Sequence, residues 1–232
     1  MPKVIKKRIT KKTSADTEEG VKEKLSSFRD IIKERQQTAI KYAAAVLIII
    51  VAVAGFSIYS YTSKQKARGL EYEAYKIYYN APSQGANKGD KYTKALDMFK
   101  KAYDSKKSPS SLFYIAACYS ELGNYEEAIK TLKDFTGRYS GNAMYAPLAY
   151  QKLASAYIMK GDLQEAQKTL TTLYNLKGDI LKDFALMESA KILEKEGKPN
   201  EAKLKYEELA KKFPNSPFNE EIKTKLGVKK EG

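Results

Sequence analysis

The stretch Ser120–Leu132, which reads SELGNYEEAIKTL, decides the fold of this chain because the chain repeats it twice. Met159–Leu170 reads MKGDLQEAQKTL, and Glu194–Tyr206 reads EKEGKPNEAKLKY. In each of the three copies an alanine follows a glycine by five residues. A fourth alanine lies earlier in the chain, and the residues around it match the repeated pattern less well. The aligned alanines stand 33, 38 and 36 residues apart, a period that indicates a repeat architecture. These residues are Gly123, Gly161 and Gly197, and Ala95, Ala128, Ala166 and Ala202.

Other residue types recur in phase with the later alanines. An alanine stands twelve residues before each of them, a large side chain nine before, and another large side chain four after. Small residues let two antiparallel helices cross closely, and large residues a turn away fill the space beside the crossing. The glycine supplies the positive φ that ends the first helix, so the pattern predicts stacked helical hairpins. The residues in phase are Ala116, Ala154 and Ala190; Tyr119, Tyr157 and Leu193; and Phe99, Leu132, Leu170 and Tyr206.

The spacing of Ala116, Tyr119, Gly123 and Ala128 resembles the tetratricopeptide repeat family, and the resemblance covers roughly residues 65–218. It implies an all-α fold, in which residues 64–232 form a short α-solenoid of about four helical hairpins and a capping helix. The first hairpin departs from the pattern, because its turn is several residues too long. We expect the repeats near 66–105, 109–140, 146–178 and 183–214, and the capping helix at 218–227.

The composition excludes catalytic and metal sites that need histidine or several cysteines, although carboxylates are plentiful. The 232 residues include no histidine and a single cysteine, Cys118, so zincin sites, Ser-His-Asp and Cys-His pairs and an intrachain disulfide are ruled out. The sequence has no phosphate-binding loop, dinucleotide fingerprint or acidic calcium loop. We therefore expect no enzyme activity, no cofactor and no metal site. We interpret Cys118 as a small buried hydrophobic residue.

Residues 42–63, YAAAVLIIIVAVAGFSIYSYTS, carry no charge. As a helix these 22 residues extend about 33 Å, enough to cross the roughly 30 Å hydrocarbon layer of a membrane. We therefore predict a transmembrane helix at 39–63. A cleaved signal peptide is the alternative, since Ala52 and Ala54 fit a cleavage site. The 41 residues before the apolar stretch favour a signal-anchor over a signal peptide.

Basic residues are concentrated before the predicted span. Residues 1–41 hold 12 Lys/Arg against 6 Asp/Glu, and KVIKKRITKK (Lys3–Lys12) contains six of the basic residues. Because basic segments translocate poorly, we expect the N-terminus in the cytoplasm and the repeats on the other side. We interpret residues 1–16 as a basic arm that acts as a topology signal. Binding of anionic lipid or RNA by this arm is the alternative.

The apolar spacing in residues 17–38 predicts an amphipathic juxtamembrane helix. Val21, Leu25, Phe28 and Ile32 recur at helical spacing and share one face. Such a helix either lies on the bilayer or runs straight into the span.

The first helix of each hairpin is expected to line a concave groove. Residues taken at helical spacing along these helices are mostly apolar or small, which suits an extended apolar or neutral polypeptide, or a helix of a partner. The family's clamp for acidic C-terminal tails needs Lys and Asn where this chain has Phe113, Ala117, Gln151 and Ser155, so that resemblance fails. Coverage of the groove by the array's own terminal helix is an equal alternative. The predicted groove residues are Phe113, Ala117, Ser120, Leu148, Gln151, Ser155, Ile158, Phe184, Met187 and Lys191, with Glu194 beside them.

The order of parts and the stretch TSKQKARGLEYEAYKIYYNA (62–81) resemble the YfgM-like ancillary subunit of the Sec translocon. This resemblance implies a single-pass protein of the bacterial inner membrane with periplasmic repeats. Such a protein lies beside the protein-conducting channel and contacts emerging polypeptides or periplasmic chaperones. The chain departs from that family in its longer, more basic N-terminal segment and in having no tryptophan.

A static scaffold for assembly of a cell-envelope, secretion or motility complex is the alternative function. The segment FPNSP (213–217) resembles repeats of outer-membrane-assembly and TolA-binding proteins. An organelle import receptor would leave the repeats in the cytosol, and the charge bias across the span opposes that arrangement. We expect protein partners, one membrane helix and no specific nucleic acid, and the sequence leaves the oligomeric state open.

Overall fold

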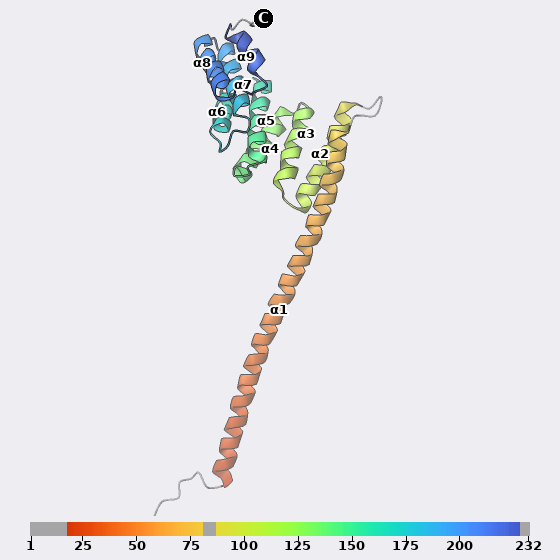
Figure 1. The fold of residues 1–232 in the computed structure, drawn as a ribbon. Helices are drawn as coiled ribbons and strands as arrows, with labels where there is room; N and C mark the ends of the chain where they lie inside the picture. The colour runs from red at the N-terminus through yellow and green to blue at the C-terminus, as the bar shows by residue number, and fades with distance from the viewer. Residues whose placement is uncertain (1–17, 81–86, 228–232) are drawn as a thin grey trace, which may run out of the picture. The chain divides into compact units, whose positions relative to one another are not determined.

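The computed structural model of this chain describes residues 18–80 and 87–227. Within those two ranges all regular structure is helical, which confirms the expected all-α fold class (Figure 1). The expected basic arm at 1–16 and residues 81–86 of the long turn lie outside the described residues. The helices are α1 (Glu18–Tyr79), α2 (Lys88–Ser105), α3 (Pro109–Glu121), α4 (Tyr125–Tyr139), α5 (Tyr145–Lys160), α6 (Leu163–Tyr174), α7 (Lys182–Lys195), α8 (Pro199–Lys212) and α9 (Asn219–Lys225).

The chain divides into two compact units, Met1–Tyr61 and Thr62–Gly232. Helix α1 has 62 residues and belongs to both units, because it continues without a break past Tyr61. The amphipathic segment expected at 17–38 is therefore, from Glu18 onward, the first part of α1 and not a helix of its own.

In the first unit, α1 carries large apolar side chains that no protein core surrounds. Leu47, Ile48 and Ile50 are 64%, 67% and 61% exposed. By length and composition α1 can cross a membrane, and none of its most apolar window is buried by other described residues. A continuous apolar surface of this kind is stable in an apolar surrounding, which agrees with the span predicted at 39–63.

The second unit is a series of helix pairs. α3 packs with α4, α5 with α6 and α7 with α8, each pair packs on the next, and α9 packs on α8 (Figure 1). The part of α1 from Thr62 onward forms the first pair with α2. The rings of Tyr75 on α1 and Phe99 on α2 lie 5.2 Å apart, and Ala74 and Ala95 are fully buried in the same cluster.

The turns inside the last three pairs share one structure. Gly123, Gly161 and Gly197 have φ of 73°, 86° and 73°, as the repeated glycine predicts. In each turn the residue after the glycine donates its backbone N–H to a carbonyl five residues earlier, which is the Schellman arrangement. The accepting carbonyl belongs to the repeated Tyr or Leu, so this position both closes the helix and packs against its neighbours. The bonds run from Asn124 to Tyr119, from Asp162 to Tyr157 and from Lys198 to Leu193, each 2.9 Å long.

We expect the substitution Gly161→Ala to lower the free energy of unfolding by about 1–2 kcal/mol, because an L residue in this left-handed conformation brings its Cβ against a carbonyl oxygen. Gly137→Ala, inside α4, is the matched control, and we expect it to raise the free energy of unfolding. A Cβ added at Gly137 meets nothing within 4 Å, and alanine stabilises a helix interior by about 0.5–1 kcal/mol relative to glycine. Denaturant unfolding of the two variants tests this, and shifts of the same sign would contradict it.

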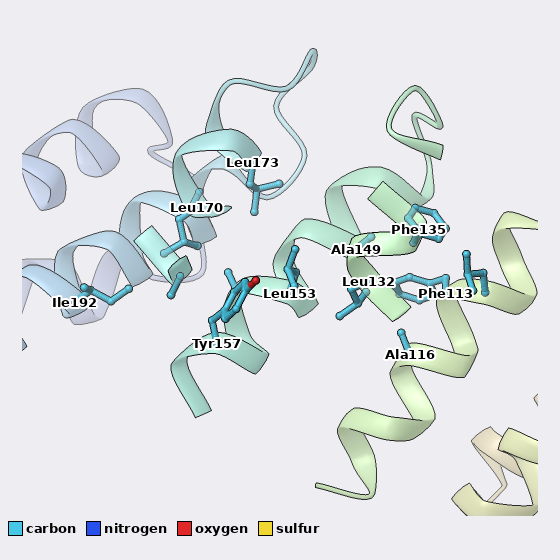
Figure 2. Packing of buried hydrophobic residues seen from close by; sticks show 14 residues of the cluster. Phe113, Ala116, Leu132, Phe135, Ala149, Leu153, Tyr157, Leu170, Leu173 and Ile192 are labelled. Atoms are coloured by element: carbon cyan, nitrogen blue, oxygen red, sulfur yellow. The ribbon is translucent and has the colours of Figure 1, made fainter. Parts of the chain in front are cut away.

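The core of the second unit follows the repeat. The alanines at the helix crossings, such as Ala128 and Ala166, are fully buried, and large side chains fill the space beside them. Figure 2 shows Leu132 and Phe135 packed near Ala116 and Ala149, with Leu170 and Leu173 beyond Leu153. Close crossing at the alanines is therefore the reason why the hairpins stack tightly enough to exclude water.

Candidate protein-interaction surface

The structure places the predicted groove residues at two different depths. Phe113, Ala117 and Met187 are 5%, 0% and 0% exposed, so they belong to the core and not to a binding surface. The reason is contact with neighbouring helices, which the spacing of residues along a single helix does not reveal. The ring of Phe113 lies 5.3 Å from Tyr145 on α5 and 6.3 Å from Phe135 on α4. The other predicted residues, all half-buried, are Ser120, Leu148, Gln151, Ser155, Ile158, Phe184 and Lys191.

At the C-terminal end of the array, α9 covers part of α7. Ile222 of α9 is 1% exposed and packs in the same cluster as Met187. Lys191 on α7 forms an ion pair with Glu221 at 3.4 Å, and Glu194 on α7 forms one with Lys225 at 2.8 Å. The chain's own terminal helix therefore covers this end of the predicted groove, which was the alternative expected from the sequence.

At the N-terminal end, aromatic side chains from three helices lie in a row. We call Tyr75, Tyr79, Tyr114 and Tyr145 the aromatic row, and the buried Phe113 connects Tyr114 with Tyr145 from the core side. The rings of Tyr75 and Tyr114 lie 4.8 Å apart, those of Phe113 and Tyr114 lie 5.3 Å apart, and Phe113 contacts Tyr145. The row thus runs from α1 through α3 to α5, with Tyr79 66% exposed at its start.

The sequence analysis did not identify the aromatic row. The available signal was the pair Tyr75 and Tyr79, four residues apart on one face of a helix and outside the repeat spacing. Their meeting with Tyr114 and Tyr145 depends on contacts between helices.

The hydroxyl groups of the row are hydrogen-bonded to each other and to α3. The Oη atoms of Tyr79 and Tyr114 lie 2.6 Å apart, and Tyr75 Oη bonds Ser110 Oγ. Burial raises the pKa of Tyr75, and it raises the pKa of Tyr114, where the bond to Tyr79 adds to the effect. Both phenols therefore stay neutral at physiological pH and offer an apolar ring with a polar edge.

The carboxylate of Glu71 fixes α1 against the start of α3. Ser108 Oγ donates a hydrogen bond of 2.7 Å to Glu71 Oε1, and the fully buried Ser111 bonds the same oxygen. Ser108 also caps α3, since its Oγ accepts from the backbone N–H of Ser111 at 3.0 Å. These bonds hold the helix that carries Tyr75 and Tyr79 in register with the helix that carries Tyr114.

Several polar side chains on the first helices are neutral, whereas the Glu71 carboxylate beside Tyr75 is charged. Ser110 and Gln151 carry no charge, and neither do Ser120 and Ser155 farther along the first helices. Aromatic rings with hydroxyl groups provide large contact area at low entropic cost, and neutral neighbours do not select for charged ligands. The arrangement suits an extended neutral or apolar polypeptide. Among the described residues no cluster of carboxylates or thiols could hold a metal ion.

We expect Cys118 to be unreactive toward thiol reagents in the folded protein. Its side chain is fully buried, and burial raises the pKa of its thiol to about 12, so the reactive thiolate is scarce at neutral pH. Reaction with a chromogenic disulfide reagent should therefore be slow in buffer and fast in denaturant. Fast reaction of the native protein would contradict the burial of α3.

The fold defines a class of protein: a short solenoid in which helical hairpins stack on their neighbours. The family profile described as "Tetratricopeptide repeat-like domain" matches residues 36–228, and the chain belongs to this family. Domains of this family are protein-interaction modules and are generally not enzymes. The match includes the uncharged stretch at 42–63 as well as the repeats.

Solved structures show the same fold. The crystal structure of MamA protein is similar with a TM-score of 0.54 and 18% identity, over 72% of this chain and 80% of that one. A putative kinesin light chain from Podosopora anserina with nearly identical TPR-like repeats gives a TM-score of 0.53 and 17% identity, over 70% and 84%. At these identities the likeness shows the fold alone. A search of curated proteins finds no match.

Proposed function

We propose that this chain is a membrane-anchored tetratricopeptide module that binds extended polypeptides on the extracytoplasmic side of the bacterial inner membrane, in association with the protein-translocation channel and periplasmic chaperones. The observation that carries the proposal is that the aromatic row begins on α1. Tyr75 and Tyr79 belong to the same helix as the exposed apolar stretch before Lys64. The proposed anchor and the first proposed binding residues therefore belong to one continuous helix.

Three further features support the proposal. The surplus of basic residues before the apolar stretch favours a cytoplasmic N-terminus. The neutral tyrosines of the row and the serine bonded to Tyr75 suit unfolded segments of varied sequence, which share apolar side chains and unpaired backbone groups but no common charge. Coverage of α7 by α9 limits the open face to α1, α3 and α5, a length suited to a short extended segment.

The binding proposal is tested by photo-crosslinking in the intact bacterium. A photoreactive amino acid replaces Tyr79, which is 66% exposed in the row, or Ile158, which is half-buried on α5. The matched control replaces Leu204 on α8, which is 64% exposed and lies on the second helix of its pair. We expect exported precursors, with channel subunits or chaperones, among the adducts from Tyr79 and Ile158 and few from Leu204.

Other outcomes would overturn this proposal. A single envelope protein captured in high yield would support the alternative function, a static scaffold of a cell-envelope, secretion or motility complex. Equal capture from Leu204 would show that the first-helix face has no special role.

The proposed topology is tested separately with reporter fusions after Gly227. We expect a periplasm-specific phosphatase to be active there and a cytoplasm-specific fluorescent protein to be dark. The reverse pattern would place the repeats in the cytosol and would remove the translocation proposal, while leaving the solenoid as a binding module.

A further inference from the structure

The part of α1 between Val21 and Arg35 has an unpartnered apolar face. Val21, Leu25, Phe28 and Ile32 are 47%, 66%, 69% and 57% exposed. At about 100° per residue they lie within an arc of about 60° of the helix circumference. We call these four residues the apolar stripe. Such a surface lowers its free energy when another apolar phase covers it.

Charges on this part of α1 are sorted by sign around the stripe. At about 100° per residue, five basic residues lie within about 110° of the stripe's centre, on both sides of it. The three acidic residues lie within about 30° of the line opposite the stripe. The basic residues are Lys22, Lys24, Arg29, Lys33 and Arg35, and the acidic residues are Glu23, Asp30 and Glu34.

Four of these basic residues, Lys24, Arg29, Lys33 and Arg35, form no ion pair with a side chain that the structure describes, unlike many in the repeats. In the second unit Lys101 pairs with Asp97 and Lys168 with Glu165, each at 2.6 Å. Arg29 and Lys33, four residues apart, repel each other on the helix surface, and an external anionic surface would relieve that repulsion.

We propose that this part of α1 binds an anionic lipid surface, with the apolar stripe in the headgroup–acyl boundary and the flanking lysines and arginines on lipid phosphates. A bilayer interface is the one surface that offers an apolar layer and an anionic layer at adjacent depths along a whole helix. Long basic side chains reach from the flanks of a buried helix to the phosphates. The acidic residues then face water.

A second copy of the chain fits the apolar stripe and its flanking charges less well than a lipid surface does. Two copies anchored by the same span would pair as parallel helices. The stripe would then be the seam, and Lys24 of one helix would face Arg29 of the other. These like charges oppose the pairing, whereas the same charges favour an anionic surface.

Binding the surface needs a change of direction in α1 before the uncharged stretch. Thr38 marks a suitable point, because its Oγ1 donates to the carbonyl of Glu34 at 2.9 Å, a bond that often bends helices. The inference rests on the proposed membrane anchoring but not on the binding of polypeptides.

The test uses the full chain reconstituted into vesicles, with an environment-sensitive dye on Leu25→Cys in the stripe or on Ser26→Cys facing away from it. Cys118 stays unlabelled because it is buried. We expect the fluorescence emission of the dye at position 25 to shift to shorter wavelength in vesicles with about 30% phosphatidylglycerol. No such shift is expected in purely zwitterionic vesicles. The dye at position 26 should shift less, and about 0.5 M salt should reverse the effect.

The charge requirement is tested by combining Lys22→Gln, Arg29→Gln and Lys33→Gln. We expect the population of the bound state to fall about a hundredfold, since each basic residue contributes about a factor of five at an anionic surface. The matched control, Lys130→Gln with Lys203→Gln and Lys211→Gln, removes the same charge from exposed positions of the repeats and should change nothing.

Three results would overturn the inference: no blue shift in any vesicle, an equal shift without anionic lipid, or a shift that disappears when the protein is diluted among vesicles. The last result would assign the stripe to a second copy. Failure of the membrane anchoring itself is recognised separately, because the protein would then be extracted from vesicles by alkaline carbonate.

Discussion

The substitution Phe135→Ala is expected to lower the free energy of unfolding of the repeat unit by about 3–5 kcal/mol. Phe135 is fully buried on α4, between Phe113 of α3 and Tyr139 of its own helix. Truncating it removes the transfer free energy of the ring and leaves a cavity that rigid neighbouring helices cannot close. Since domains are stable by only about 5–15 kcal/mol, this is roughly a fifth or more of the total.

Unfolding of the full chain in detergent micelles measures this loss. The thiol of Cys118 reports the opening of the repeats, and the tyrosine circular dichroism reports loss of packing. We expect a fall of about 10 °C in Tm, given about 2–4 °C per kcal/mol for a unit of this size. Leu204→Ala, at a position 64% exposed, is the control and should stay within about 0.5 kcal/mol of the parent. Equal Tm values for the two variants would show that α4 does not contribute its aromatic residue to the core.

The second large effect is expected from overpacking a helix crossing. Ala166 is fully buried on α6, in the same cluster as Ala154 of α5. Ala166→Leu adds three carbon atoms where the two backbones approach, so the side chain must take a strained rotamer or force the helices apart. The expected cost is about 1–3 kcal/mol.

The matched control for this substitution is Ala143→Leu, which adds the same atoms at an exposed position between α4 and α5. We expect it to leave the unfolding midpoint unchanged in the same denaturant titration. If Ala166→Leu were as stable as Ala143→Leu, the alanines of the repeat would not be spacing residues, and the physical account of the motif would be wrong.

For both variants, a loss of stability must be distinguished from a loss of polypeptide binding. Because a hairpin contacts only its neighbours, damage at Phe135 or Ala166 is expected to spread to the adjacent pair and then weaken. Crosslinking from Tyr79 on α1 therefore gives a readout several helices away from Ala166 on α6. Loss of capture there in Ala166→Leu would indicate that the open face requires the complete stack.

The repeated turns were predictable because they depend on residues close in the chain. A glycine five residues before an alanine requires a left-handed turn and a close crossing, and both are set within one hairpin. Gly161 and Ala166 behave as the spacing predicts, with positive φ and full burial. The helical class and the stacking followed from the same signals, since a single hairpin cannot bury its own apolar face.

The depth of the groove residues was less predictable. Helical spacing correctly places Phe113, Ala117 and Met187 on the first helices, but it does not give the distance to the neighbouring first helix. That distance decides whether a side chain that lies between two first helices is exposed to solvent or buried. In this chain Phe113 meets Tyr145, and Met187 meets α9, so both are core residues.

By itself, the sequence determined the all-α class, the repeated turns, the small residues at the crossings and the exclusion of histidine- and disulfide-dependent chemistry. These features depend on composition and on periods of one helical turn or one hairpin. Only the tertiary structure decided that Tyr75, Tyr79, Tyr114 and Tyr145 lie in one row beside Phe113 and that α9 closes the other end of the face. The physical reason is that these contacts join residues about 30 or more positions apart, and the packing of whole helices brings them together.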